Sequence, residues 1–170
     1  MEVTVGRTTV VLESELPGGT KGAPPPTTLP VQMESLTRAK ATATFRLREV
    51  RDPRFSLSGV TQIGSGHSEV AVLHYAAPNR EAWLKVIERP LRPDGLESKF
   101  GIYGALMEAA EVRGRICAVV TSSLLDRERN PLVSRPIRCV AFETGGVLIV
   151  IRSYGITRDQ LLAVAEGFED

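Results

Sequence analysis

Residues 139–168 read CVAFETGGVLIVIRSYGITRDQLLAVAEGF, and this stretch decides the fold. Two apolar runs flank residues 143–146, ETGG, and paired glycines supply the positive φ angles that a tight hairpin turn needs. Thr157 stands three residues before Gln160, which is the spacing of a capping box at the start of a helix. The residues that follow at helical spacing are apolar: Leu161, Val164, Ala165 and Phe168. The stretch therefore predicts two antiparallel strands and a closing helix whose apolar face lies on the sheet.

The middle of the chain shows apolar and polar residues in alternation between short turns. Residues 69–76 read EVAVLHYA and residues 83–88 read WLKVIE, with a Pro-Asn turn between them. Together with the alternating residues 55–63, they predict a three-stranded antiparallel meander. Residues 45–48, FRLR, alternate as well and predict a further strand ahead of the Asp52-Pro53 turn.

The later strands are apolar on both faces. Residues 116–120 and 147–151 lose the alternation almost completely, so both sides of the sheet are expected to be covered there.

Ser35 is a candidate N-cap for a short helix over residues 36–43. Seven or eight strands in antiparallel order, with this early helix and the C-terminal helix packed on them, predict an α+β protein with a single large curved antiparallel sheet, a half-barrel.

Composition divides the chain into three parts. Residues 1–15 are rich in β-branched residues and predict one or two short strands. Residues 16–34 follow as a linker or loop, because residues 16–30 hold five prolines and three glycines, which suit neither a helix nor a central strand. Residues 35–170 are expected to form the curved-sheet domain. Within it, residues 96–110 fit either an irregular helix or a mobile loop, and the sequence does not decide between them.

The charge balance argues against nucleic acid as a partner. The 170 residues include 21 basic and 20 acidic side chains, and no basic cluster is interleaved with aromatic residues.

No stretch approaches the roughly 18 apolar residues of a membrane-spanning helix. The two histidines lack cysteine or carboxylate partners at metal-ligand spacing, and no phosphate-binding glycine motif or nucleophile elbow is present. We therefore predict no metal, no cofactor and no enzymatic activity.

Cys117 and Cys139 are the only cysteines. They fall in two strands that the loop 124–136 can pair as a hairpin, which would bring them to neighbouring positions of the sheet. Either they form a disulfide, or they are two small buried hydrophobic residues with inert thiols. Both alternatives stay open at this point.

Several pieces of the sequence carry a resemblance to a known family. They are residues 70–75, VAVLHY, residues 83–88, WLKVIE, residues 111–114, EVRG, and residues 142–166, which hold the hairpin and the helix. From Thr44 onward, their order resembles a bacterial domain family found at the C-termini of membrane-anchored proteins, including anti-sigma-factor-like regulators. Members of that family resemble the LolA-like lipoprotein carriers and the periplasmic sigma-regulator half-barrels. This chain has Phe142 where the family pattern has a tryptophan.

The resemblance implies a non-enzymatic binding or sensor domain outside the cytoplasm. Such a domain is held by a flexible linker on a membrane anchor that this sequence does not include, and it binds a lipid or a protein signal of the cell envelope. A cytoplasmic location stays open as an alternative. No catalytic residue is carried over from the family.

The concave face of the predicted half-barrel is the candidate surface for an apolar or lipid-like ligand. The residues assigned to it are Val72, His74, Trp83, Val119, Phe142 and Ile149. The simpler alternative is that helices and sheet curvature fill this face as ordinary core. A different class of function is a protein-interaction module that acts through a sheet edge in residues 2–12 or through the loop 124–136. The sequence does not decide the oligomeric state.

Overall fold

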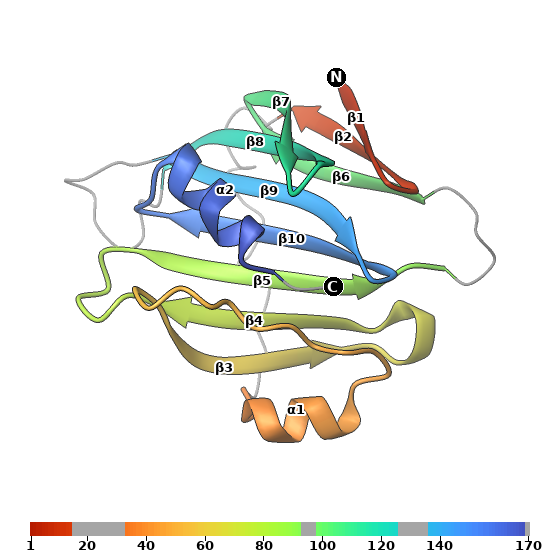
Figure 1. Cartoon of the computed structure of the whole chain (residues 1–170), viewed down its shortest axis with the longest axis vertical. Helices are drawn as coiled ribbons and strands as arrows, with labels where there is room; N and C mark the ends of the chain where they lie inside the picture. Colours follow the sequence, from red (N-terminus) through yellow and green to blue (C-terminus); the bar gives the residue numbers. More distant parts are fainter. Residues whose placement is uncertain (15–32, 93–97, 126–135, 169–170) are drawn as a thin grey trace, which may run out of the picture.

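The structure, a computed structural model, describes residues 1–14, 33–92, 98–125 and 136–168 and has the predicted α+β architecture (Figure 1). Its strands are β1 (Glu2–Val5), β2 (Thr8–Ser14), β3 (Ser56–Ile63), β4 (Val70–Ala76), β5 (Trp83–Pro90), β6 (Ser98–Gly104), β7 (Leu106–Val112), β8 (Arg115–Leu125), β9 (Pro136–Thr144) and β10 (Val147–Tyr154). Its α-helices are α1 (Leu36–Thr42) and α2 (Arg158–Glu166), and a single 3-10 turn, η1 (Gly66–Ser68), precedes β4.

Seven of the strands form one antiparallel sheet in the order β3-β4-β5-β10-β9-β8-β7. The predicted meander is confirmed as β3-β4-β5, and the predicted hairpin is confirmed as β9-β10. Gly145 and Gly146 take φ angles of 52° and 75° in its turn, a conformation that costs a residue without a Cβ little. Because β10 pairs with β5, the hairpin joins the early meander to the later strands, and the sheet stays open rather than closing into a barrel.

A second, three-stranded sheet has the order β1-β2-β6, and its β2 and β6 are parallel. The prediction of a helix or loop over residues 96–110 is wrong for the described part, which forms β6 and β7. The strand β6 depends on a partner far away in the sequence, since Thr8 pairs with Ser98. A Cβ at Gly104 would come within 2.3 Å of Val120, so the glycine lets the chain turn closely from the small sheet into the large one.

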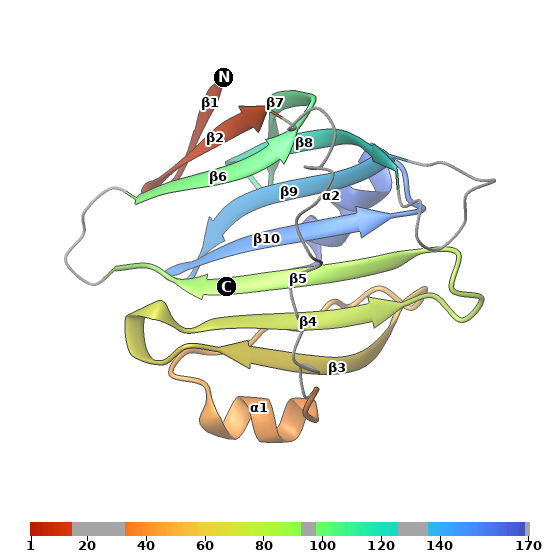
Figure 2. The same ribbon diagram turned by 180° about the vertical axis from the view of Figure 1, so that it is seen from behind.

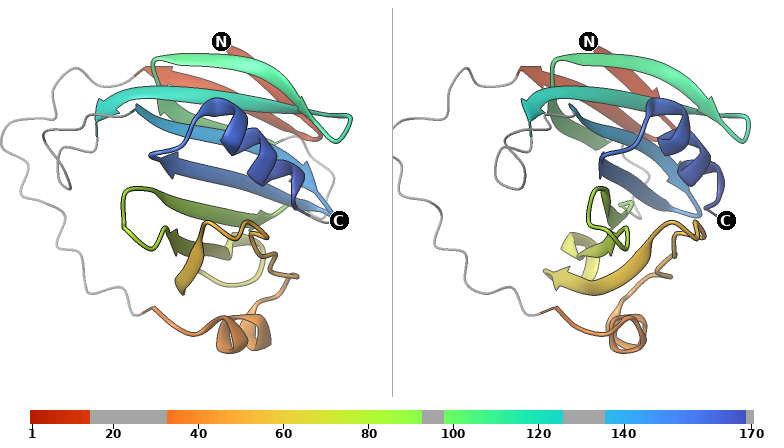
Figure 3. Two further views of the ribbon diagram at one scale, coloured as in Figure 1. Left: turned by 60° about the vertical axis from the view of Figure 1, so that its left-hand side comes forward. Right: turned by 90° about the vertical axis from the view of Figure 1, so that its left-hand side faces the viewer.

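The two helices and the small sheet cover different parts of the large sheet. We call the side that carries α2 the helix face, and the other side the opposite face. Figure 1 draws α2 in front of β9 and β10, and Figure 2, seen from behind, draws β6 in front of the later strands. The expectation that the late strands are covered on both sides is thus confirmed, with one core between α2 and the sheet and a second beneath β1, β2 and β6. The side views in Figure 3 place α1 next to β3, in the other half of the sheet.

Residues 45–48 are not a strand, which corrects the sequence-based expectation. They belong to residues 43–55, the covering segment, which runs across the helix face in front of β4 (Figure 1). A chain that crosses the face of a sheet cannot join its hydrogen-bond ladder, so side chains must pair its buried N–H groups. Glu88 Oε1 accepts from the Arg48 N–H at 2.9 Å, and the Tyr75 hydroxyl accepts from the Val50 N–H at 3.1 Å.

Of the predicted linker, only Met33 and Glu34 lie within the described residues. Glu34 exchanges two backbone hydrogen bonds with Val60 of β3, at 2.9 and 3.0 Å. Ser35 then caps α1, as predicted, by accepting from the Arg38 N–H at 3.3 Å.

The predicted capping box of α2 is present in full. Thr157 Oγ1 accepts from the Gln160 N–H at 3.2 Å, and Gln160 Oε1 accepts from the Thr157 N–H at 2.8 Å. Replacing Thr157 with alanine is expected to lower the free energy of unfolding by about 1 kcal/mol, because one N–H at the helix start loses its acceptor. Urea unfolding followed by circular dichroism measures this change. Thr157→Ser keeps the hydroxyl and is expected to recover most of the loss, whereas equal losses in both variants would contradict the assignment.

Candidate functional site

The predicted ligand-binding residues do not share one face of the sheet. Val119, Phe142 and Ile149 are buried in the core on the helix face. Val72, His74 and Trp83 point the other way and are only half-buried. The reason is strand alternation: Leu73, Leu84 and Val86 occupy the helix face, so their neighbours along β4 and β5 must lie on the opposite face. The single apolar surface expected from the sequence is therefore two surfaces, of which only the opposite face has accessible predicted residues.

Strand register arranges side chains of the opposite face in parallel rows. Val72 of β4 pairs with Ile87 of β5, and Ile87 pairs with Val150 of β10, which makes an apolar row across three strands. Two residues further along each strand, a second row crosses the same strands with basic side chains: His74, Lys85 and Arg152. Because residues two apart on a strand point to the same face, the basic row lies directly beside the apolar row.

The basic row places like charges opposite each other. Lys85 and Arg152 are directly paired across β5 and β10, an arrangement that is unfavourable unless negative charge is near. His74 lies next to Lys85, and its Nε2 is 3.2 Å from Thr61 Oγ1. Burial and, to a smaller extent, the charge of Lys85 lower the pKa of His74, so at neutral pH the permanent positive charge of the row comes from Lys85 and Arg152.

An aromatic pair borders the basic row. Trp83 and Tyr154 stack with ring centroids 6.2 Å apart and planes at 15°. Lys85 Nζ lies 5.5 Å from the centre of the Trp83 ring, within the range of a cation–π contact. The Trp83 indole is therefore in contact with the charged part of this face.

A cavity of about 200 Å³ lies where β6 approaches the large sheet. Its lining is mostly apolar and includes Ile87 and Val150 of the apolar row and Arg152 of the basic row. The strand β6 contributes Phe100, Ile102 and the exposed Tyr103. The apolar row thus ends in a small cavity with a guanidinium at its border. We call the two rows, the aromatic pair and this cavity the row site.

Cys139 also lines this cavity, whereas Cys117 is buried on the helix face. The prediction that the two cysteines reach neighbouring positions is wrong: Cys139 pairs with Val120, and the strand alternation turns Cys117 to the other side. Both thiols are free, as the alternative without a disulfide expected. Burial raises the pKa of each thiol, which keeps both protonated at neutral pH.

The described residues show neither a metal cluster nor a membrane-spanning helix. No group of histidine, cysteine and carboxylate side chains within them could hold a metal ion. None of the helices in the described ranges has the length and hydropathy to cross a membrane.

Sequence reasoning found part of the row site and missed the rest. His74, Trp83 and Val72 were predicted, but Lys85 and Arg152 were not, although Lys85 alternates with Trp83 and Ile87 in WLKVIE. Arg152 follows an apolar run, and only the pairing of β10 with β5 places it beside Lys85. The contribution of β6 was also missed, because residues 96–110 were expected to form an irregular helix or a loop and not a strand.

The fold and this site have no counterpart in the comparisons with known proteins. A scan against protein-family models, a search of curated proteins and a search of solved structures each found no match. The resemblance to the C-terminal domains of anti-sigma-factor-like and LolA-like proteins therefore stays a prediction.

Proposed function

We propose that this protein is a non-enzymatic binding domain that holds an anionic amphiphile, such as a fatty acid or a lysophospholipid, at the row site. The observation that carries the proposal is the pair of adjacent rows, one apolar and one basic, that ends in an apolar cavity. A role outside the cytoplasm, as a carrier or sensor in the cell envelope, belongs to the same proposal and rests on the family resemblance.

The basic row favours a negatively charged head group. Lys85 and Arg152 lie side by side across β5 and β10, so their two positive charges attract a carboxylate or phosphate, and the protein binds an anion in preference to a cation. Arg152 is exposed and Lys85 is half-buried, which leaves both side chains accessible to a ligand.

The apolar row and the cavity favour an alkyl tail. A volume of about 200 Å³ is below the range of roughly 300–1,000 Å³ that is typical of small-molecule pockets, so the cavity suits the end of a chain and not a whole ligand. The remaining methylene groups would lie along Val72 and Ile87, which are half-buried. Each buried methylene contributes about 0.8 kcal/mol, so affinity is expected to rise with tail length.

Trp83 is the only tryptophan and gives a direct readout, because it contacts the basic row. Its fluorescence is followed while sodium dodecanoate, sodium octanoate or dodecyltrimethylammonium bromide is added below the micelle concentration. We expect dodecanoate to bind at least about tenfold more tightly than octanoate, because four methylenes contribute well over the ~1.4 kcal/mol that a factor of ten requires. The ammonium compound, which has the same tail, is expected to bind more weakly than dodecanoate.

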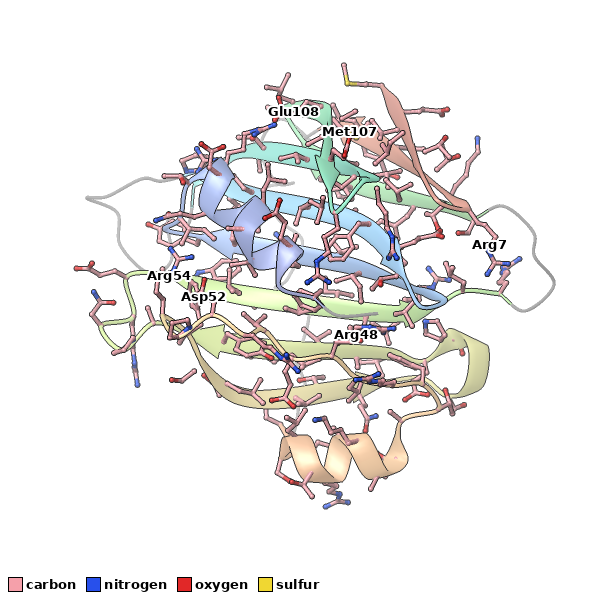
Figure 4. All side chains as sticks on the ribbon, viewed as in Figure 1. Arg7, Arg48, Asp52, Arg54, Met107 and Glu108 are labelled. Atoms are coloured by element: carbon pink, nitrogen blue, oxygen red, sulfur yellow. The ribbon has the colours of Figure 1, made fainter. Side chains whose placement is uncertain are left out.

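The double variant Lys85→Gln/Arg152→Gln is expected to weaken dodecanoate binding about tenfold or more, since each charged hydrogen bond is worth roughly 1.5–3 kcal/mol. Its matched control is Arg7→Gln/Arg38→Gln, which removes the same net charge at two exposed positions away from the row site. Figure 4 shows Arg7 at the turn between β1 and β2. Equal binding of dodecanoate and the ammonium compound, or an equal loss in the control, would overturn the proposal. Failure of the folded protein to bind either compound would also overturn it and favour a protein-interaction module.

A further inference from the structure

A second and larger cavity lies on the helix face, so the large sheet separates it from the row site. Its volume is about 490 Å³, and it is lined by residues 45–51 of the covering segment together with Lys40 and Gly167. Arg48, labelled in Figure 4, belongs to this lining and lies where the covering segment meets β5.

The lining of this cavity is predominantly basic. Its cationic side chains are Lys40, Arg46, Arg48 and Arg51, and its one carboxylate is Glu49, which pairs with Lys40. Arg46 is exposed, whereas Arg48 is nearly buried and donates from Nη1 to the carbonyl oxygen of Arg46 at 3.2 Å. A cavity with this excess of positive charge attracts anions.

Directly below the lining, Glu88 of β5 is completely buried. Its Oε1 accepts from the Arg48 N–H, while its Oε2 has no hydrogen-bond partner among the described residues. The nearest charge to Oε2 is Arg48 Nη1, at 3.9 Å, which is too long for a hydrogen bond. A buried carboxylate oxygen without a partner is costly, so it calls for an explanation by function.

The surroundings of Glu88 contain few other ionisable groups. Its strand neighbours on either side are Ala71 of β4 and Ile149 of β10, both apolar and buried. Within the described ranges, the groups whose charge or titration is coupled to it are Arg48, above it, and Tyr75 of β4. Burial raises the pKa of Glu88 to about 7, against the smaller opposing effect of Arg48.

We propose that this cavity binds a small oxyanion of the sulfate or phosphate class, and that Glu88 takes up one proton from water as the anion binds. An anion at the Arg48 guanidinium competes with Glu88 for the same positive charge. Two negative charges so close together in a weakly screened interior repel each other, and protonation of the carboxylate removes the repulsion. The protonated oxygen then needs no cation, and the side chain stays buried as a neutral acid.

The test is a titration with sodium sulfate, which keeps its charge across the pH range used. Backbone amide resonances of residues 45–51 are followed at pH 5.5, 7 and 8.5, with sodium chloride to hold the ionic strength constant. In the wild-type protein, affinity is expected to fall by up to about tenfold per pH unit above pH 7, as linkage to one proton requires. Glu88→Gln, which is uncharged at every pH, is expected to bind sulfate with the same affinity throughout.

Arg48→Gln is expected to weaken sulfate binding about tenfold at pH 5.5. Arg46→Gln is a second variant that tests the same lining at an exposed position. Arg38→Gln is the control, because Arg38 is exposed, pairs with Glu34 and lies outside the cavity. Wild-type affinity that is the same at pH 5.5 and 8.5 would overturn the proposal, as would an equal loss in Arg38→Gln. Competition by glycerol 3-phosphate at pH 5.5 would identify a soluble phosphate ester as the natural class of ligand. Competition only by phosphatidate vesicles would identify a lipid head group.

Discussion

Replacing Glu88 with glutamine is expected to remove a loss of about 3 kcal/mol in stability that the wild-type protein undergoes between pH 4.5 and pH 7. The carboxyl is completely buried, and burial is the main reason that its pKa rises from 4.5 to about 7 in the folded protein. The folded state therefore holds this proton more tightly than the unfolded state. Unfolding releases the proton in that pH window, so the contribution of Glu88 to stability is fully present below pH 4.5 and is lost as the pH rises to 7.

The measurement is urea unfolding of both proteins at intervals of half a pH unit from 4 to 8.5. Other groups titrate over the same range, so the informative quantity is the difference in unfolding free energy between Glu88→Gln and wild type. That difference is expected to grow in favour of the variant by about 3 kcal/mol and to level off above pH 7. A difference that is constant with pH would show that the pKa of Glu88 is the same in the folded and unfolded states, and would contradict the effect of its burial without a close partner.

Arg48→Gln gives a second test of the same pair. The charge of Arg48 lowers the pKa of Glu88, so its removal is expected to move the pH window upward. An unchanged window would mean that the two side chains are not electrostatically coupled.

Leu161→Ala is expected to lower the free energy of unfolding by about 2–5 kcal/mol. Leu161 is fully buried where α2 packs on β9 and β10, in the core that also contains Phe142 and Ile149. Truncation to alanine removes this apolar contact and leaves a cavity that a packed sheet and helix close only in part.

The matched control is Leu162→Ala, the same change at the next position of the same helix. Leu162 is only half-buried at the margin of this core, so its truncation is expected to cost less than half as much. Urea unfolding at constant pH measures both variants, with Trp83 fluorescence as the signal. Equal costs would mean that α2 does not dock through the face that carries Leu161.

The two candidate sites use opposite sides of one sheet for different chemistry. The row site combines apolar and basic side chains on strands, and the second cavity lies between a non-repetitive segment and the end of α2. Their experiments are independent, because variants of Lys85 and Arg152 leave the cavity at Arg48 intact. Loss of dodecanoate binding at the row site would not decide whether the second cavity binds sulfate, and each proposal is tested with its own control variants.

The sequence by itself determined the elements whose signals are local. The ETGG turn and the Thr157–Gln160 capping box predict the β9–β10 hairpin and α2, because a turn and a helix start depend on residues a few positions apart. The Ser35 N-cap of α1 and the alternating strands of the meander were likewise predicted from residues that are close together in the sequence. Alternation also indicates that Glu88 is buried, because residues two apart on a strand point to the same face and Glu88 is two positions after Val86 and four after Leu84.

Only the tertiary structure decided which of these residues act together. The pairing of β2 with β6 joins segments about ninety positions apart. The covering segment is not a strand of the sheet, although FRLR alternates. The pairing of β10 with β5 places Arg152 beside Lys85. Alternation has a period of two and assigns faces within one strand, but it contains no information on which distant strand pairs with it or in which register. The basic row, the accessible apolar row and the unpartnered carboxylate of Glu88 all arise from such pairings, so they become visible only when the chain is folded.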